Sequence, residues 1–336
     1  MKKYLALVLA LCMVLALSIE AFAAEKPADY PKSDITGVVP FKAGGGTDNV
    51  MRPLANYANK ILGVTITINN MPGASGATGM AYVADQASDG YTLLMTAESP
   101  CLYDAMETGD YTYADFEQIC LVGAETVFIV VSKDSPYQTL EDLINEAIAN
   151  PGTLTMPISG PTALGAIVGA MLNYTTGASF AYIPSEGDGD AFAQLLSGQA
   201  DVVMSKTSTV GGYYDNGDIT ILACINNVRM DNFPDCPAIT EIYPDFEQCL
   251  PFTSFYCVSV KKDTPAEIVA YLKDVFAEAF NNPEFQNYLV ETCAMEPMGY
   301  IGDEADEYIN SWRKSVITAL YAAGTAHFSP EELGVK

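Results

Sequence analysis

A glycine cluster near the start of the chain is the first segment suited to binding an anion. It reads PFKAGGGTD at 40–48 and lies between a short apolar stretch at 35–41 and an amphipathic helical pattern at 48–62. Glycines let backbone N–H groups approach a ligand, and a helix N-terminus adds partial positive charge, so a carboxylate or phosphate would fit there. Taken alone, the cluster is equally explained as a tight turn with Thr47 or Asp48 as the helix cap.

A second turn of the same kind reads ISGPTALG at 158–165 and again precedes a helical pattern. It places the hydroxyls of Ser159 and Thr162 beside the N–H groups of a helix start, although capping would explain these hydroxyls too. If the fold brings the two turns together, they would form a clamp for an acid. A chain of net charge −26 could then hold an anion without an arginine.

Residues for catalysis, metals or nucleic acids are scarce in this sequence. The single histidine, His327, lies near the end of the chain, and Ser205 beside Lys206 does not by itself make a nucleophile–base pair. The glycines at 44–46 fit neither a P-loop nor a dinucleotide motif, and the acidic run at 186–190 lacks the spacing of a calcium loop. Sixteen basic against 42 acidic side chains disfavour nucleic acid. We therefore expect no enzyme, no cofactor and no metal.

The segment 1–23 has the features of a secretory signal peptide. Two lysines precede an apolar stretch, and small residues at Ala21 and Ala23 suit a cleavage site. The alternative is a membrane anchor, but the apolar stretch is shorter than the roughly 20 residues that a spanning helix needs. Cys12 raises a lipoprotein alternative, which the preceding leucine disfavours. We expect an exported protein, periplasmic or otherwise extracytoplasmic.

The seven cysteines that follow the signal segment form no CxxC pair. An odd number cannot all pair within one chain, so the sequence indicates mostly buried thiols. A Cys249–Cys257 or a Cys224–Cys236 disulfide stays open. The seven are Cys101, Cys120, Cys224, Cys236, Cys249, Cys257 and Cys293.

Strand-like and helix-like segments alternate along the chain, which predicts an α/β fold with a mainly parallel sheet. The pattern restarts near residue 154, which indicates two lobes of similar construction. Apolar strands expected at 126–132 and 255–260 would carry the chain between the lobes. We therefore assign 25–129 and 256–336 to lobe 1 and 130–255 to lobe 2, joined by a two-strand hinge. Two independent tandem domains are the alternative.

Five motifs, taken together, resemble the substrate-binding receptors of tripartite tricarboxylate transporters, the TctC or Bug family. They are PFKAGGGTDNVMRPLA (40–55), NNMPGASGATG (69–79), SDGYTLL (88–94), LLSGQAD (195–201) and RMDNFPDCPAITE (229–241). The resemblance implies a type II periplasmic binding protein fold, with two α/β lobes joined by two hinge strands. It also implies a monomeric receptor that closes on a small organic acid and delivers it to a membrane permease.

The same resemblance implies the binding residues, because in this family the two turns hold a carboxylate of the ligand. Thr96 and Ser205, expected after two strands, would complete the wall of the site. By motif position the turn residues are Phe41, Ala43, Gly44, Gly45, Thr47 and Asp48 on one side, and Ser159, Gly160, Thr162 and Ala163 on the other.

The chain also departs from the family pattern. It has Ala166 where relatives commonly carry a histidine, and Ser185-Glu186-Gly187 where they have tyrosine–lysine–glycine. These changes disfavour a highly charged tricarboxylate and suggest one recognised carboxylate with a polar or cationic remainder. An amino acid held by Asp48 or Glu186 would fit. A sensory or partner-docking protein that signals the presence of such a ligand is the alternative to uptake.

Overall fold

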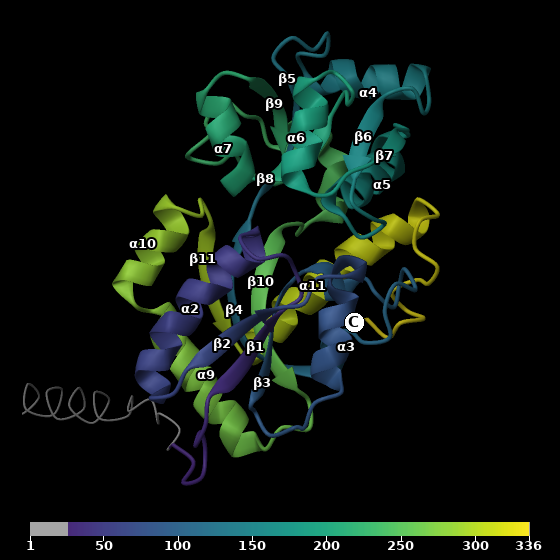
Figure 1. The fold of residues 1–336 in the computed structure, drawn as a ribbon. Coiled ribbons are helices and arrows are strands. Elements are labelled where there is room, and N and C mark those ends of the chain that lie inside the picture. Colours follow the sequence, from purple (N-terminus) through teal and green to yellow (C-terminus); the bar gives the residue numbers. More distant parts are fainter. Residues whose placement is uncertain (1–25, 336) are drawn as a thin grey trace, which may run out of the picture.

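The computed structural model describes residues 26–335 and shows two α/β bodies, one above the other (Figure 1). The lower body contains a six-stranded sheet in the order β11-β4-β10-β3-β1-β2. The upper body contains a three-stranded sheet, β8-β5-β9, and a two-stranded sheet, β6-β7. The expected signal segment and Cys12 lie outside the described residues. Within them, no helix combines the length and apolar composition needed to cross a bilayer.

The six-stranded sheet is parallel on one side and antiparallel on the other. β1, β2 and β3 run parallel, whereas β10 runs antiparallel to both β3 and β4, and β11 runs antiparallel to β4. The strands are β1 (Ile35–Val39), β2 (Ile66–Asn70), β3 (Thr92–Ala97), β4 (Phe116–Glu125), β10 (Ser254–Lys261) and β11 (Glu296–Ile301). The near-continuous burial of β1, β3, β4 and β10 fits strands that are covered on both faces, whereas β2 and β11 are the partly exposed edges of the sheet.

Helices cover the two faces of this sheet through separate cores. Apolar residues of α2, α9 and α10 pack on one face, while α3 and α11 contribute to clusters on the other. The helices are α2 (Gly46–Leu62), α3 (Ala77–Ala84), α9 (Ala266–Phe280), α10 (Pro283–Glu291) and α11 (Asp303–Ala322). The predicted helix at 48–62 is confirmed as α2, which ends at Gly63 in the left-handed conformation (φ 75°) that favours glycine.

The sheets of the upper body depart from the parallel arrangement that the sequence predicts. β5 runs antiparallel to both β8 and β9, and only the pair β6–β7 is parallel. β5 follows β4 after the single residue Thr126, so the chain enters the upper body as a strand. No crossover helix precedes β5, although a parallel strand would need one. The strands are β5 (Val127–Ser132), β6 (Thr155–Ile158), β7 (Ala181–Pro184), β8 (Val203–Lys206) and β9 (Ile219–Cys224).

The upper body has five α-helices among the described residues. Thr139 caps the first of them with a reciprocal capping box to Asp142, as its sequence allows. The helices are α4 (Leu140–Ala149), α5 (Leu164–Thr176), α6 (Asp188–Leu196), α7 (Thr207–Asp215) and α8 (Ile239–Ile242). Short 3₁₀ turns complete the chain at η1 (Ala74–Gly76), η2 (Ser99–Cys101), η3 (Tyr113–Asp115) and η4 (Pro244–Cys249).

Helix α11 contacts both bodies, although its sequence position places it after the last strand of the lower sheet. Trp312 stacks on Phe252 with ring centroids 5.7 Å apart, and its indole N–H donates to the Thr253 carbonyl at 3.0 Å. On the other side, Arg313 donates to the Cys101 carbonyl and to the Asp104 carboxylate. The apolar face of α11 shares one core cluster with α5 of the upper body. This helix therefore ties the two bodies together in addition to the strand connections.

The seven cysteines within the described chain are all buried free thiols, in agreement with the predicted burial. Neither of the two disulfides left open by the sequence is formed. Cys224 and Cys236 lie within hydrogen-bonding range of one another, and burial raises the pKa of the Cys249 and Cys257 thiols to about 12. These thiols act as small apolar core residues.

Candidate functional site

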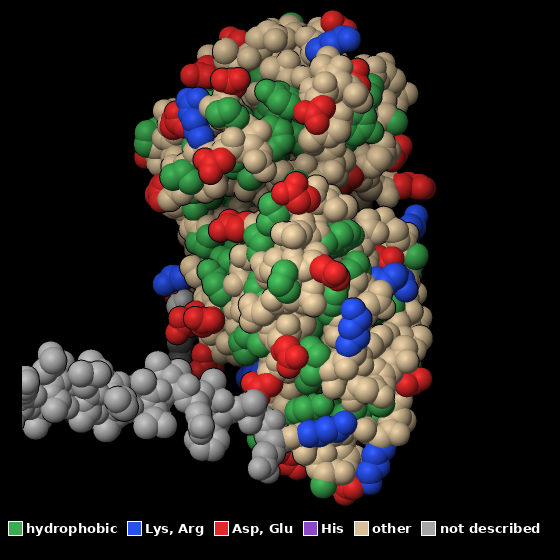
Figure 2. Space-filling view, turned by 90° about the vertical axis from the view of Figure 1, so that its left-hand side faces the viewer, with side chains coloured by type: hydrophobic (Ala, Val, Ile, Leu, Met, Phe, Trp, Pro, Cys, Tyr) green, Lys and Arg blue, Asp and Glu red, His purple; other side chains and the backbone are tan. Residues whose placement is uncertain are grey.

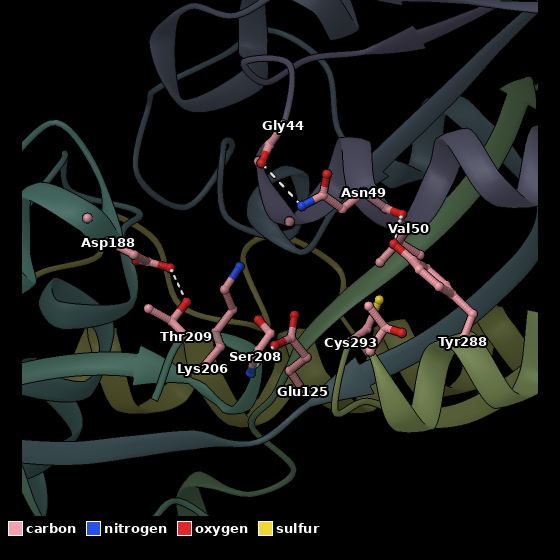
Figure 3. A pocket seen from close by; sticks show the side chains of 14 residues that line it. Gly44, Asn49, Val50, Glu125, Asp188, Lys206, Ser208, Thr209, Tyr288 and Cys293 are labelled. Atoms are coloured by element: carbon pink, nitrogen blue, oxygen red, sulfur yellow. Dashed lines mark hydrogen bonds between the residues drawn. The ribbon is translucent and has the colours of Figure 1, made fainter. Parts of the chain in front are cut away.

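Two adjoining cavities lie around the N-terminus of α2. The cleft between the bodies has a volume of about 440 Å³ and is lined from below by the 40–47 turn and the end of β3, and from above by the ends of β6 and β8 and the start of α5. The second cavity, of about 470 Å³, lies among the starts of α2, α6 and α7 and the end of α10 (Figure 3). Both cavities share Gly45, Gly46, Asp188 and Lys206.

The N-terminus of α2 opens on both cavities without a side-chain cap. Gly45 is the N-cap residue, and no side chain within the described chain caps the helix. The residue that the sequence suggested as a cap, Asp48, instead accepts hydrogen bonds from the Gly44 N–H (2.9 Å), Arg52 and the Asn70 amide (3.0 Å). The first N–H groups of α2 are therefore left for a ligand or for water.

Asp48 fixes the shape of the glycine turn. It is 4% exposed, and although burial raises its pKa, hydrogen bonds from Arg52, the Gly44 N–H and Asn70 lower the pKa below its usual value. An ionised carboxylate that accepts three such bonds holds the turn against the first turn of the helix. The sequence suggested that Asp48 could pair with a ligand ammonium. Because its carboxylate oxygens already accept hydrogen bonds from Gly44, Arg52 and Asn70, Asp48 is poorly placed for that pairing.

The N-terminus of α5 faces the same cleft from the upper body, and it is uncapped as well. Thr162 is 3% exposed and lines the cleft, and its hydroxyl oxygen Oγ1 has no hydrogen-bond partner in the described structure. Buried hydroxyls without a partner are rare because the lost hydration costs free energy. The backbone at Gly160 has φ 156°, and a Cβ there would lie 3.2 Å from Ser75 Oγ of the lower body. The 158–165 turn thus approaches the short η1 turn of the lower body across the cleft.

Seven of the twelve sequence-predicted site residues line one of the two cavities. Gly44 lines the second cavity and Gly45 lines both. The residues on the cleft are Phe41, Gly45, Thr47, Ser159, Thr162 and Ala163. The residues on neither wall are Ala43, Asp48, Thr96, Gly160 and Ser205.

Thr96 and Ser205 are displaced from the cleft by the alternation of side chains along a strand. Both were expected after strands, but Thr96 lies within β3 and Ser205 within β8, and both are fully buried. Successive strand residues point to opposite faces, so the cleft is instead reached by neighbours such as Ala97 and Lys206. The hydroxyls of Thr96 and Ser205 have no partner among the described residues.

Lys206 is the main cation that sequence reasoning missed. Its ammonium donates to the Tyr256 hydroxyl at 3.3 Å, and that hydroxyl donates to Glu125 at 2.5 Å. Figure 3 shows Lys206 projecting into the second cavity between the side chains of Asp188 and Glu125. Burial alone would lower the pKa of Lys206, but the nearby Tyr256, Glu125 and Asp188 outweigh that effect and raise the pKa above its usual value. The side chain therefore stays charged.

Glu98 is the buried acid that sequence reasoning missed. It follows β3, lines the cleft and is 7% exposed, and it accepts a hydrogen bond from the Ser254 hydroxyl at 3.0 Å. Burial raises the pKa of Glu98, and the charge of Lys206 offsets that rise only in part. Glu98, Lys206 and Ser254 come from distant parts of the chain, so no local motif marks them.

Comparison with known proteins gives a consistent set of relatives. A family model described as "Tripartite tricarboxylate transporter family receptor" (TctC) matches residues 50–314. The structure of periplasmic binding protein BugD is 25% identical, with a TM-score of 0.76 over 88% of this chain and 99% of that one.

Two further structures from Rhodopseudomonas palustris contain ligands. Rpa4515 with adipate is 24% identical with a TM-score of 0.78, over 88% of this chain and 99% of that one. MatC with bound malate is 23% identical with a TM-score of 0.70, over 88% and 97%. At these identities the two structures establish likeness of fold, and both ligands named for them are dicarboxylic acids.

Proposed function

This chain belongs to the TctC family of tripartite tricarboxylate transporter receptors, and from that premise we propose that it is an exported receptor which captures a small organic acid in its cleft. It would deliver the acid to the membrane permease of such a transporter and act as a monomer. The family consists of binding proteins rather than enzymes, and the fold is the α/β fold of periplasmic binding proteins such as BugD. Relatives with this fold hold carboxylates, namely adipate and malate.

One observation carries the proposal: two uncapped helix N-termini and the unpartnered Thr162 hydroxyl meet in one cleft. Free N–H groups at a helix start bind anions, and the helix dipole favours negative charge there. The Thr162 hydroxyl can donate one more hydrogen bond to a carboxylate oxygen. A cleft of about 440 Å³ is within the usual range for small-molecule sites.

The position of the cleft also fits a receptor that closes on its ligand. One carboxylate-binding turn belongs to the lower body and the other to the upper body, so a bound acid would bridge them. The strand connection at Thr126 and the connection into β10 would form the hinge. Closure around the acid would then be the signal that a permease recognises.

The test removes the Thr162 hydroxyl while keeping the shape of the side chain. We expect Thr162→Val to weaken binding of the best acid from a panel of adipate, malate and amino-substituted acids by roughly 10- to 100-fold, the size of one hydrogen bond to a charged group. Thr264→Val is the matched control, because Thr264 is also a buried threonine with an unpartnered hydroxyl but lies outside both cavities.

Isothermal titration calorimetry on the exported protein would measure these affinities, after a thermal-shift screen has chosen the acid. A ligand that binds the native state raises the melting temperature by an amount that grows with the logarithm of its free concentration once that exceeds the Kd. The proposal fails if no acid in the panel stabilises the protein, or if Thr162→Val and Thr264→Val change the affinity equally.

A further inference from the structure

The cleft contains more negative than positive side chains, which is unexpected for a site that binds an anion. Two lysines face at least four carboxylates in and beside it. Those lining the cleft are Lys42, Lys206, Glu98, Glu186 and Asp188, and Glu125 lies beside Lys206 in the adjoining cavity. Figure 2 shows acidic and basic side chains interspersed over both bodies on one face of the molecule.

Lys206 compensates for these acids only in part. Its ammonium donates a hydrogen bond to the Tyr256 hydroxyl at 3.3 Å, and that hydroxyl donates one to the carboxylate of Glu125, which is 2% exposed. Glu125 also accepts from the Ser208 N–H at 3.0 Å. The positive charge of Lys206 is therefore committed to the buried Glu125 on the hinge side of the cleft. Lys42, the other cleft lysine, is exposed.

Glu98 is left without a cation of its own. Its one side-chain hydrogen bond in the described structure comes from Ser254, and neither Glu98 nor Glu186 forms an ion pair among the described residues. A carboxylate that is almost fully buried is costly unless a positive charge or several donors satisfy it. The exposed part of Glu98 faces the cleft, so a ligand can supply the missing charge.

A second observation points to a carboxylate on the same ligand. Thr162 is nine-tenths buried and lines the cleft, its hydroxyl has no hydrogen-bond partner in the described structure, and it lies beside the uncapped start of α5. The donors for an anion and the acid for a cation thus occupy one cavity. A dicarboxylate would place its second negative charge among Glu98, Glu186 and Asp188, where like charges repel.

We propose, on the basis of the receptor function above, that the ligand is an amino acid in the broad sense: a carboxylic acid that carries an ammonium group. Its carboxylate binds at Thr162 and the helix N-termini, and its ammonium pairs with Glu98, with Glu186 on the opposite side of the cleft. The acidic wall then serves specificity, because it excludes dicarboxylates of the same length.

The test compares acids with six carbons, which differ in charge but little in size. Adipate carries two carboxylates, hexanoate carries one, and 6-aminohexanoate and 2-aminohexanoate each carry one carboxylate and one ammonium. We expect one of the two amino acids to bind at least about tenfold more tightly than hexanoate and adipate, because it adds a charge-assisted hydrogen bond. Adipate or hexanoate binding as tightly as both amino acids would overturn the inference while leaving the receptor function intact.

Variants locate the ammonium subsite. Glu98→Gln keeps an acceptor for Ser254 but removes the charge, so we expect the affinity for the amino acid to fall roughly 10- to 100-fold and the affinity for adipate to stay or rise. A purely structural role for Glu98 would lower both affinities together, and that result would refute the assignment. Glu267→Gln is the control, since Glu267 is exposed in the first turn of α9 and lines neither cavity.

Discussion

Replacing Lys206 with methionine tests the hydrogen-bonded chain that joins the two bodies at the hinge. Lys206 belongs to β8 of the upper body, whereas Tyr256 and Glu125 belong to β10 and β4 of the lower sheet. The links of 3.3 Å and 2.5 Å place the ammonium within about 6 Å of a carboxylate oxygen of Glu125. At that separation and an effective dielectric constant near 20, two unit charges attract by about 3 kcal/mol.

The net loss of stability is smaller than this attraction, because Lys206 also gives up hydration when it enters the cavity. We expect Lys206→Met to lower the free energy of unfolding by about 2 kcal/mol, or the melting temperature by about 3 °C for a chain of this size. Urea titration followed by circular dichroism, together with a thermal melt at pH 7, would measure both quantities. Lys133→Met is the control, since Lys133 is exposed and lines neither cavity.

A double-mutant cycle with Glu125→Gln then decides whether the charge pair is the cause. If Lys206 acts through Glu125, the double variant should be more stable than the sum of the two single losses predicts, by 1 kcal/mol or more. Losses that add to within about 0.5 kcal/mol would refute the reasoning, because they would mean that Lys206 contributes through packing alone.

Two further predictions concern the cleft. Gly46→Ala should weaken ligand binding about tenfold, since its Cβ would lie 2.9 Å from the Tyr256 hydroxyl and 3.1 Å from the Lys206 ammonium. Calorimetry would measure the affinity. The control is Gly211→Ala, whose Cβ meets nothing within 4 Å and which should bind normally. Binding of an amino-substituted acid should weaken as the pH falls from 7.5 to 5. Burial raises the pKa of Glu98 and Lys206 offsets this only partly, so Glu98 takes up a proton above its usual range and loses the charge that pairs with the ammonium. Equal affinities at both pH values, or the same slope in Glu98→Gln, would contradict the second prediction.

The sequence predicted those features that depend on neighbouring residues. The start and end of α2 follow from the glycines at 44–46 and at Gly63 and from the apolar spacing between them. The two glycine turns could be identified as anion sites because each contains its own donors. That both of them line one cleft depends on the fold, which the family motifs supplied.

The features that the sequence did not reveal depend on strand ends and on distant contacts. Thr96 and Ser205 lie within β3 and β8 rather than after them, and their buried side chains do not line the cleft, whereas those of the next residues, Ala97 and Lys206, do. Lys206, Glu98 and Tyr256 meet only after β8, β3 and β10 have been assembled, and their sequence neighbours contain no signal for that meeting. Asp48 was expected to be available as a cap or a ligand partner, but Arg52 and Asn70 already occupy it.

The position of α11 has a consequence for how the chain reaches its native state. Part of the core around α5 is supplied by Trp312, Val316 and Leu320, which lie more than 130 positions after that helix in the sequence. The upper body therefore cannot complete its core until α11 has docked against α5, and contacts between residues so far apart in sequence form slowly. The two bodies should for that reason gain their final stability together, in the step that seats α11.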